Sequence, residues 1–194
     1  MKHKVIDNFL DKEYFDSLAT IFINKEKGVG DFLERDRWHE EKKNMSVSQR
    51  ASVLPWFFQT DKEWSAHDKI FYMTHVLYEK NELKTSFYEM IKPLLAKMKI
   101  RCLIRLKANL FPNTETLHEH TMHIDYNFPH TGAILSLNTC DGYTKLKDGT
   151  KINSVANRLL LFDAAEKHCS TTTTNVAARV NININYIQVQ ENGK

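Results

Sequence analysis

The spacing of apolar residues predicts two helices in the first hundred residues. Apolar side chains there recur every three or four positions in two segments, which is the period of a helix that buries one face. The first segment follows the candidate cap Asp11 and has its apolar residues at Tyr14, Phe15, Leu18 and Phe22. The second starts at the capping-box pattern Ser86-Phe87-Tyr88-Glu89 and has its apolar residues at Phe87, Met90, Ile91, Leu94, Leu95 and Met98. Pro93 lies inside this second helix and should kink it.

The second half of the chain has the pattern of short strands. Residues 102–109 alternate between apolar and polar side chains, and the other segments with strand character are His118–Tyr126, Thr131–Asn138, Arg158–Phe162 and Ala178–Gln190. Turn signals separate them at Pro129–Gly132, Asp141-Gly142 and Asp148-Gly149. Before residue 100, Ile70–Tyr78 also predicts a strand, and the aromatic cluster Leu54–Phe58 is expected in the core.

This order of elements predicts an α+β fold. Several short strands that follow a helical half indicate a β-sandwich or a jelly roll (a double-stranded β-helix), supported by N-terminal helices. We expect a single domain over residues 1–194, with 1–99 as mainly helical support and 100–194 as the jelly-roll core. The charge-dense segment Gly28–Gln49 predicts a solvated loop, and an active-site lid is the alternative.

Composition narrows the setting of the protein. The net charge of +3 is too small to indicate nucleic-acid binding. No apolar run has the length of a membrane span, and the first residues lack the apolar region of a signal peptide. The odd number of cysteines, Cys102, Cys140 and Cys169, argues against a disulfide framework. We therefore expect a cytoplasmic protein.

His123-Ile124-Asp125 is the strongest candidate for chemistry. On a strand its histidine and aspartate point to the same face, whereas His118 and His120 point to the other. His168, after the apolar strand Leu159–Phe162, would complete a set of two histidines and one carboxylate, the ligand set of non-haem ferrous iron. His118-Glu119-His120 resembles half of a cupin site but lacks the later glutamate, and His130 lies in a predicted turn.

A row of polar residues on the last strand forms a second group. Arg179, Asn181, Asn183 and Asn185 share one face, and apolar residues occupy the other. A polar inward face on such an apolar strand indicates a lined cavity, and a guanidinium there suits a bound carboxylate. An exposed polar face of an antiparallel sheet is the structural alternative.

These residues resemble the 2-oxoglutarate- and Fe(II)-dependent dioxygenases, in particular the prolyl 4-hydroxylase-like branch and its small phage-type members. The resemblance rests on the ordered set His123-Ile124-Asp125, Leu159–Phe162, His168 and Arg179, eleven residues after His168. Thr131–Asn138 and Val5–Leu10 are also similar to family segments. Two departures stand out: the interval from Asp125 to His168 is short, and Asn109, Phe111, Leu135 and Ser136 occupy the regions where many relatives carry tyrosines.

The resemblance implies a site and a reaction. His123, Asp125 and His168 would be the catalytic iron ligands, and Arg179 would bind the distal carboxylate of 2-oxoglutarate, with Asn181, Asn183 and Asn109 as further cosubstrate-binding candidates. The implied cofactors are Fe(II), 2-oxoglutarate and O2, with ascorbate as a candidate reductant. The implied activity is hydroxylation of an unactivated C–H bond in a peptidyl residue such as proline or in a free amino acid.

Two alternatives remain open from sequence. One is a dioxygenase for a nucleobase or another small molecule, for which the loop residues Arg35, Arg37, Trp38, Lys42 and Lys43 would serve. The other is a metal-binding jelly-roll module without turnover. The expected partners are 2-oxoglutarate and an unidentified peptide or small molecule, with no nucleic acid and no membrane. A phage-infected host is one candidate for the cell in which the protein works.

Overall fold

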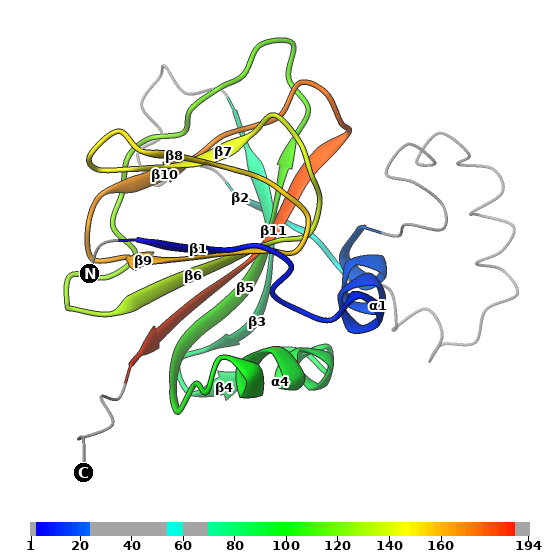
Figure 1. Ribbon diagram of the computed structural model, residues 1–194, viewed down its shortest axis with the longest axis vertical. Helices are drawn as coiled ribbons and strands as arrows, with labels where there is room; N and C mark the ends of the chain where they lie inside the picture. Colours follow the sequence, from blue (N-terminus) through cyan, green and yellow to red (C-terminus); the bar gives the residue numbers. More distant parts are fainter. Residues whose placement is uncertain (1–2, 24–53, 60–69, 189–194) are drawn as a thin grey trace, which may run out of the picture.

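A computed structural model describes residues 3–23, 54–59 and 70–188 of the 194-residue chain (Figure 1). The predicted loop Gly28–Gln49, with its lid alternative, lies outside the described residues. No helix in the described ranges is long and apolar enough to cross a membrane.

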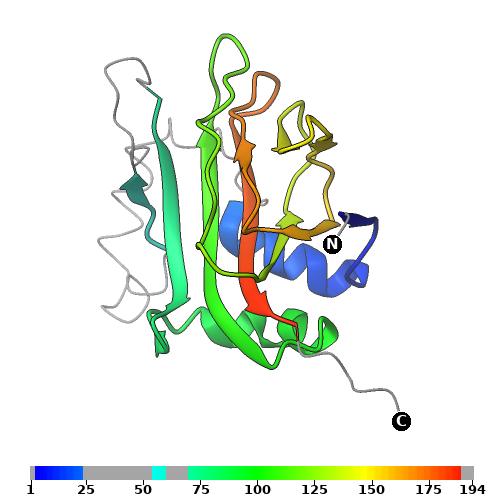
Figure 2. The same ribbon diagram turned by 90° about the vertical axis from the view of Figure 1, so that its left-hand side faces the viewer.

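An eight-stranded antiparallel sheet forms the main layer and draws on both halves of the chain (Figures 1 and 2). Its order is β1 (Lys4–Ile6), β9 (Arg158–Asp163), β6 (Thr131–Ser136), β11 (Ala178–Ile187), β5 (Cys102–Pro112), β3 (Tyr72–Glu79) and β2 (Phe57–Gln59), with β4 (Glu82–Leu83) paired to β3. The predicted strands at 70–78, 102–109, 131–138, 158–162 and 178–190 are all present with slightly different ends, and residues 189–190 of the last one lie outside the described residues. Residues 1–99, expected to be mainly helical, thus also supply four strands to this sheet.

A three-stranded sheet faces the centre of the main one. It has the order β10 (His168–Ser170), β7 (Tyr143–Leu146) and β8 (Lys151–Asn153). The hairpin between β7 and β8 turns at the predicted Asp148-Gly149, where Gly149 has a φ of 86°, a backbone conformation that glycine adopts without strain. On the other side of β10, residues 118–123 run alongside it as an extended edge with two isolated bridges.

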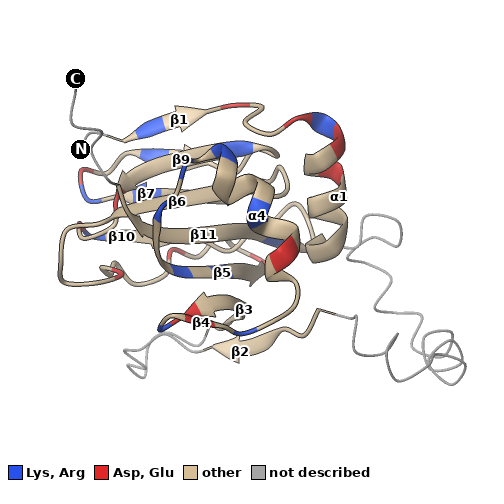
Figure 3. Ribbon diagram, turned by 90° about the horizontal axis from the view of Figure 1, so that it is seen from below, with Lys and Arg blue, Asp and Glu red and all other residues tan. Residues whose placement is uncertain are grey.

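Two helices cover the opposite face of the main sheet. Figure 3 shows α1 (Lys12–Ile23) and α4 (Tyr88–Lys97) on the side away from β7 and β10. Their buried side chains share one apolar core with the apolar face of β11; the buried members from these three elements are Phe15, Leu18, Ala19, Phe22, Ile91, Leu94, Leu95, Ala178, Val180, Ile182, Ile184 and Tyr186. Because that face of β11 is committed to the helices, its polar face must lie between the two sheets.

Of the two predicted N-terminal helix caps, the one on α1 is present and the one on α4 is not. Asp11 caps α1, since its Oδ1 accepts a hydrogen bond from the Tyr14 amide at 3.0 Å. The capping box at Ser86 and Glu89 is not formed: α4 begins at Tyr88, and its N-cap Phe87 makes no side-chain cap bond. The Thr85 hydroxyl accepts from the Phe87 amide instead, at 3.3 Å, and this local bond replaces the expected one.

Helix α4 is opened at Pro93 by a side chain from α1. The Tyr14 hydroxyl donates to the Met90 carbonyl at 2.7 Å and accepts from the Leu94 amide at 3.3 Å. These two backbone groups are four residues apart and would otherwise bond to each other. The inserted hydroxyl ties α1 to α4 beside Pro93. The kink expected at Pro93 stays a prediction, and such an insertion is one of the known physical causes of a kink.

Candidate metal centre

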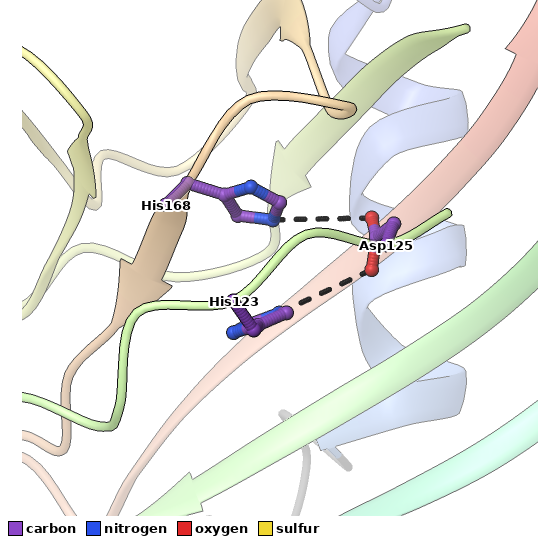
Figure 4. Close-up of side chains that lie close together, drawn as sticks. All are labelled: His123, Asp125 and His168. Atoms are coloured by element: carbon purple, nitrogen blue, oxygen red, sulfur yellow. Dashed lines mark ion pairs between the residues drawn. The ribbon is translucent and has the colours of Figure 1, made fainter. Parts of the chain in front are cut away.

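Three predicted side chains meet between the two sheets (Figure 4). His123 and Asp125 come from the extended segment before β6, and His168 opens β10. One ligand atom from each residue lies within 4.8 Å of the others. The two histidines are fixed to each other by reciprocal backbone hydrogen bonds of 2.9 Å, which place their rings with centroids 4.7 Å apart. The backbone pairing therefore brings the two imidazoles to one point.

The imidazole rings are oriented by backbone carbonyls. His168 Nδ1 lies 2.9 Å from the Glu166 carbonyl, and His123 Nδ1 lies 3.2 Å from the Thr121 carbonyl. Because a carbonyl can only accept, these contacts put the proton on Nδ1 and leave the lone pair on Nε2. The two Nε2 atoms lie 3.9 and 4.0 Å from the oxygens of Asp125. In this tautomer Nε2 of each ring is free to bind a metal.

The two histidines differ in exposure. His168 is buried and packs edge-on against Phe162, with ring centroids 4.7 Å apart. Burial lowers the pKa of His168 to about 4, against the opposing effect of the Asp125 carboxylate, so that the ring is neutral at pH 7. The His123 side chain is 49% exposed. The open side of the triad is therefore the side of His123.

Asp125 is a buried carboxylate with a partner on each oxygen. Its side chain is 4% exposed, Oδ1 accepts from Arg105 Nη2 at 2.7 Å, and Oδ2 accepts from Asn185 Nδ2 at 2.8 Å. Burial raises the pKa of this carboxyl, but the positive charges of Arg105 and its surroundings outweigh that effect and hold the pKa below its usual range. Asp125 is therefore ionised, as a metal ligand must be.

Arg179 lies buried between the sheets without an acidic partner among the described residues. It is 1% exposed, its Nη2 donates to Thr144 Oγ1 at 3.0 Å and its Nη1 to the Thr171 carbonyl at 3.3 Å, while Nε has no partner there. Burial lowers the pKa of Arg179 to about 10, which leaves it charged at pH 7. A buried cation held only by neutral oxygens is costly unless an anion pairs with it.

A glycine makes room for this guanidinium. A Cβ on Gly142 would lie 2.7 Å from Arg179 Cδ and 2.6 Å from the Thr172 carbonyl oxygen. On its other side, Arg179 stacks over the Phe111 ring at 5.3 Å. The Asp141-Gly142 turn was predicted, but its role beside Arg179 was not.

The three asparagines predicted with Arg179 are buried beside it. Asn109 on β5 is the register partner of Asn181 on β11, and its Nδ2 donates to Asn181 Oδ1 at 3.1 Å. Asn109 Oδ1, Asn181 Nδ2 and Asn183 Oδ1 are buried with no partner among the described residues. Hydrogen-bonding capacity thus remains along the polar face of β11, between the triad and Arg179.

The predicted strand His118–Tyr126 is wrong as a regular strand. It pairs with the β10 region only through Glu119↔Thr171 and His123↔His168. Glu119 and His123 are four positions apart on one segment, whereas their partners Thr171 and His168 are three positions apart on the other. The register therefore slips by one residue between the two bridges. His118 and His120 pack against each other away from the triad, with ring centroids 5.5 Å apart, and His130 lies buried in a turn with Nδ1 2.8 Å from the Phe128 carbonyl.

Sequence reasoning missed the groups that hold the predicted residues. Arg105 and Asn185, which bind Asp125, and Thr144, which binds Arg179, were not assigned to the site. Asn185 was recognised on the polar face of the last strand, and that was the available signal. Its contact with Asp125 depends on the packing of distant segments.

Comparison with known proteins decides the fold. No protein-family model and no curated protein matches the sequence. Among solved structures, a prolyl hydroxylase from Trichoplax adhaerens, in complex with a hypoxia inducible factor peptide fragment, superposes with a TM-score of 0.61 at 15% identity, covering 95% of this chain and 83% of that one. The chain has the double-stranded β-helix fold of the 2-oxoglutarate- and Fe(II)-dependent oxygenases.

Two further structures with this fold are similar over almost the whole chain. The viral collagen prolyl hydroxylase of Paramecium bursaria Chlorella virus-1, in its 2-oxoglutarate complex, has a TM-score of 0.54 at 10% identity and covers 97% of both chains. The α-ketoglutarate-dependent epimerase SnoN from nogalamycin biosynthesis has a TM-score of 0.59 at 10% identity, covering 96% of this chain and 76% of that one. The predicted jelly roll is confirmed, and the double-stranded β-helix carries more than one kind of reaction.

Proposed function

We propose that the chain is a 2-oxoglutarate- and Fe(II)-dependent oxygenase that hydroxylates an unactivated C–H bond in a peptidyl residue such as proline or in a free amino acid. The supporting observation is the polar face of β11. At one end Asn185 holds Asp125 of the triad, and at the other end Arg179 presents a buried cation without an acidic partner among the described residues. A ligand that binds a metal at one end and carries a carboxylate at the other would complete the metal site at the triad and pair with the cation of Arg179.

The donor set fits ferrous iron. Two neutral imidazole nitrogens and one ionised carboxylate are the ligands of non-haem Fe(II) oxygenases, and they leave further metal positions for other ligands. His123, Asp125 and His168 would hold the iron, and bound Fe(II) with 2-oxoglutarate would supply oxygen activation coupled to decarboxylation of the cosubstrate. The chain's own contribution is to keep both histidines in the Nδ1–H form and Asp125 ionised.

A short stretch of chain joins the two ends of the site. His168 and Thr171, whose carbonyl binds Arg179, are three residues apart, a separation of about 10 Å along an extended chain. Arg179 would pair with the distal carboxylate of 2-oxoglutarate, and Asn109, Asn181 and Asn183 would donate to or bridge the polar atoms between. The guanidinium offers the planar donor pair that a carboxylate accepts.

The surroundings of the triad support an apolar reacting group. Ile124 and Phe128, on either side of Asp125, are 42% and 40% exposed, and His123 is open on the same segment. Tyr126, Phe128 and His130 form an aromatic group with ring centroids 5.4 Å apart. Exposed apolar side chains on the segment that carries two of the ligands suit the ring or side chain of a residue such as proline.

The other substrate class has less support. The basic loop residues that would serve a nucleobase substrate, Arg35, Arg37, Trp38, Lys42 and Lys43, lie outside the described residues. A module without turnover would have no use for a buried cation aligned with a complete triad.

Turnover of 2-oxoglutarate tests the proposal. The purified protein with Fe(II) and ascorbate is incubated with 2-oxoglutarate and panels of proline-containing peptides, free amino acids and oligonucleotides, and succinate is measured. We expect succinate formation to rise with at least one peptide or amino acid, and the product to gain one oxygen atom by mass spectrometry. Matched His123→Ala and Arg179→Met proteins should lose that increase. Stimulation by oligonucleotides alone would overturn the proposed substrate, and no succinate from native protein would overturn the oxygenase.

A further inference from the structure

A closed ring of hydrogen bonds surrounds Asp125. Arg105 Nη2 donates to Asp125 Oδ1 at 2.7 Å, Asn185 Nδ2 donates to Asp125 Oδ2 at 2.8 Å, and Arg105 Nε donates to Asn185 Oδ1 at 3.2 Å. Arg105 and Asp125 are 13% and 4% exposed in their side chains, so the ring is mostly shielded from water. Each member contacts the other two, and the carboxylate cannot rotate without breaking at least one bond.

The main sheet builds this ring. Arg105 and Asn185 are direct register partners on β5 and β11. The register of the two strands shifts immediately afterwards, between Asn185 and Tyr186, and such irregularities re-aim neighbouring side chains. The Arg105 guanidinium also lies over the Tyr126 ring, 5.2 Å from its centroid. Two adjacent strands of the most extensively paired part of the fold thus present a rigid pair of donors.

The segment that carries Asp125 needs such support. Between His118 and Tyr126 the backbone forms two isolated bridges and no regular strand within the described part of the chain, and the register slips between the bridges. The Asp125 amide makes one bond, to the Ala164 carbonyl at 3.1 Å. A carboxylate on this segment is therefore not oriented by a regular ladder, whereas His168 is fixed on β10.

We propose that Arg105 and Asn185 are positioning residues that set the orientation of Asp125 for metal binding. This inference rests on the proposed function, in which Asp125 is a metal ligand. Two effects of Arg105 oppose each other: its hydrogen bond orients the carboxylate, and its positive charge repels a cation. Partners of metal ligands are commonly worth 10- to 100-fold in affinity, about 1.4 to 2.7 kcal/mol, and here orientation exceeds repulsion.

Three variants separate orientation from charge. Asn185→Ala removes one bond from Asp125 without changing the charge of the site. Arg105→Lys keeps the charge, but one ammonium cannot reach Asp125 and Asn185 with the geometry of a guanidinium. Arg105→Met removes both effects. Arg101→Met is the matched control, because Arg101 is an exposed arginine next to β5. Thermal unfolding followed by circular dichroism establishes that each variant is folded.

The probe is Mn(II) alone, titrated into each protein and followed by the loss of the free-ion electron paramagnetic resonance signal. We expect the Kd for Mn(II) to rise about tenfold in Asn185→Ala and Arg105→Lys and by up to about 100-fold in Arg105→Met, with no change in Arg101→Met. At saturating Mn(II), the Kd for 2-oxoglutarate should stay within about twofold of native in Asn185→Ala, since Arg179 is untouched. A general loss of structure would instead weaken the binding of both Mn(II) and 2-oxoglutarate.

Several results would overturn the inference. These are native Mn(II) affinity in both Asn185→Ala and Arg105→Lys, full rescue by Arg105→Lys of the loss in Arg105→Met, or tighter binding in Arg105→Met. If Arg105→Met does not fold, the Mn(II) affinities of Asn185→Ala and Arg105→Lys decide whether the inference holds. Failure of the native protein to bind Mn(II) would instead contradict the proposed metal site, so the two failures are distinguishable.

Discussion

Arg179 on β11 donates a hydrogen bond to Thr144 on β7, with 3.0 Å between Nη2 and Oγ1. This bond joins the two sheets at the end of the polar face of β11 that lies away from Asp125. The guanidinium is charged and fully buried, yet both groups that accept from it are neutral oxygens. The fold therefore holds a cation in place before any anion arrives, which lowers the entropic cost of binding one.

Loss of this cation should act on cosubstrate binding and spare the metal. In Arg179→Met we expect the Kd for 2-oxoglutarate, measured calorimetrically on Mn(II)-loaded protein, to rise by at least about 30-fold, since truncating one partner of a buried charge pair costs 2 kcal/mol or more. The Kd of Arg179→Lys should lie between those of the native protein and Arg179→Met, because lysine keeps the charge but not the planar donor pair. An unchanged Kd in Arg179→Met would show that the distal carboxylate binds elsewhere.

Gly142 should be required for the position of Arg179. A methyl group at this site would meet Arg179 Cδ and the Thr172 carbonyl at 2.7 and 2.6 Å. We expect Gly142→Ala to lower the unfolding temperature and to weaken 2-oxoglutarate binding together. The comparison is Gly149→Ala in the β7–β8 hairpin, which is strained by its positive φ but has nothing within 4 Å of the added methyl. Gly149→Ala should lower the unfolding temperature without weakening 2-oxoglutarate binding. Equal losses of 2-oxoglutarate affinity in both variants would contradict the role of Gly142 in positioning Arg179.

Glu119 should contribute stability that disappears in acid. Its carboxylate accepts from Lys145 at 2.7 Å and from the Tyr143 hydroxyl at 2.5 Å, and these contacts lower its pKa from 4.5 to about 2. Since the folded-state pKa lies below the unfolded value, the contribution is present above pH 4.5 and is lost as the pH falls towards 2. With the side chain one-third exposed, we expect about 1 kcal/mol.

The measurement is chemical denaturation of native protein and Glu119→Gln between pH 2 and 7. The difference in free energy of unfolding between them should shrink as the pH drops through this window. A difference that stays constant with pH would contradict the assignment, because other acidic groups titrate equally in both proteins.

Tyr14 should stabilise the contact between the helices. Tyr14→Phe removes the hydroxyl that satisfies both the Met90 carbonyl and the Leu94 amide, and we expect a loss of about 2 kcal/mol in the free energy of unfolding. Tyr78→Phe is the control, because its hydroxyl makes one exposed contact of 3.3 Å with Asn81. Mn(II) affinity should be unchanged in both. Equal stability of the two variants would exclude the inserted hydroxyl as a stabilising feature.

Sequence patterning predicted those features that depend on neighbouring residues. The alternation from Arg179 to Tyr186 correctly separated a core face from a polar face. Together with His123, Asp125 and His168 it located the residues that meet between the sheets. The helix at Asp11 followed from a local capping rule. These features are predictable because the spacing of apolar residues and the chemistry of a helix cap depend on residues a few positions apart.

The errors and omissions come from interactions between distant segments. The strand predicted at His118–Tyr126 has the right alternation but pairs at only two positions, since its partner β10 is three residues long. The bond between Arg105 and Asp125 requires the register of β5 on β11, which no local pattern specifies. The insertion of Tyr14 into α4 joins residues 76 and 80 positions apart.

The most direct test of the oxygenase site is spectroscopic. Under anaerobic conditions, Fe(II) and 2-oxoglutarate added together to the native protein should produce a visible metal-to-ligand charge-transfer band that neither produces alone. His123→Ala should abolish the band, and Arg179→Met should require far more 2-oxoglutarate to reach it. Absence of the band from folded native protein, at concentrations of both that saturate oxygenases of this fold, would contradict the central claim that the triad and Arg179 form one site for iron and its cosubstrate.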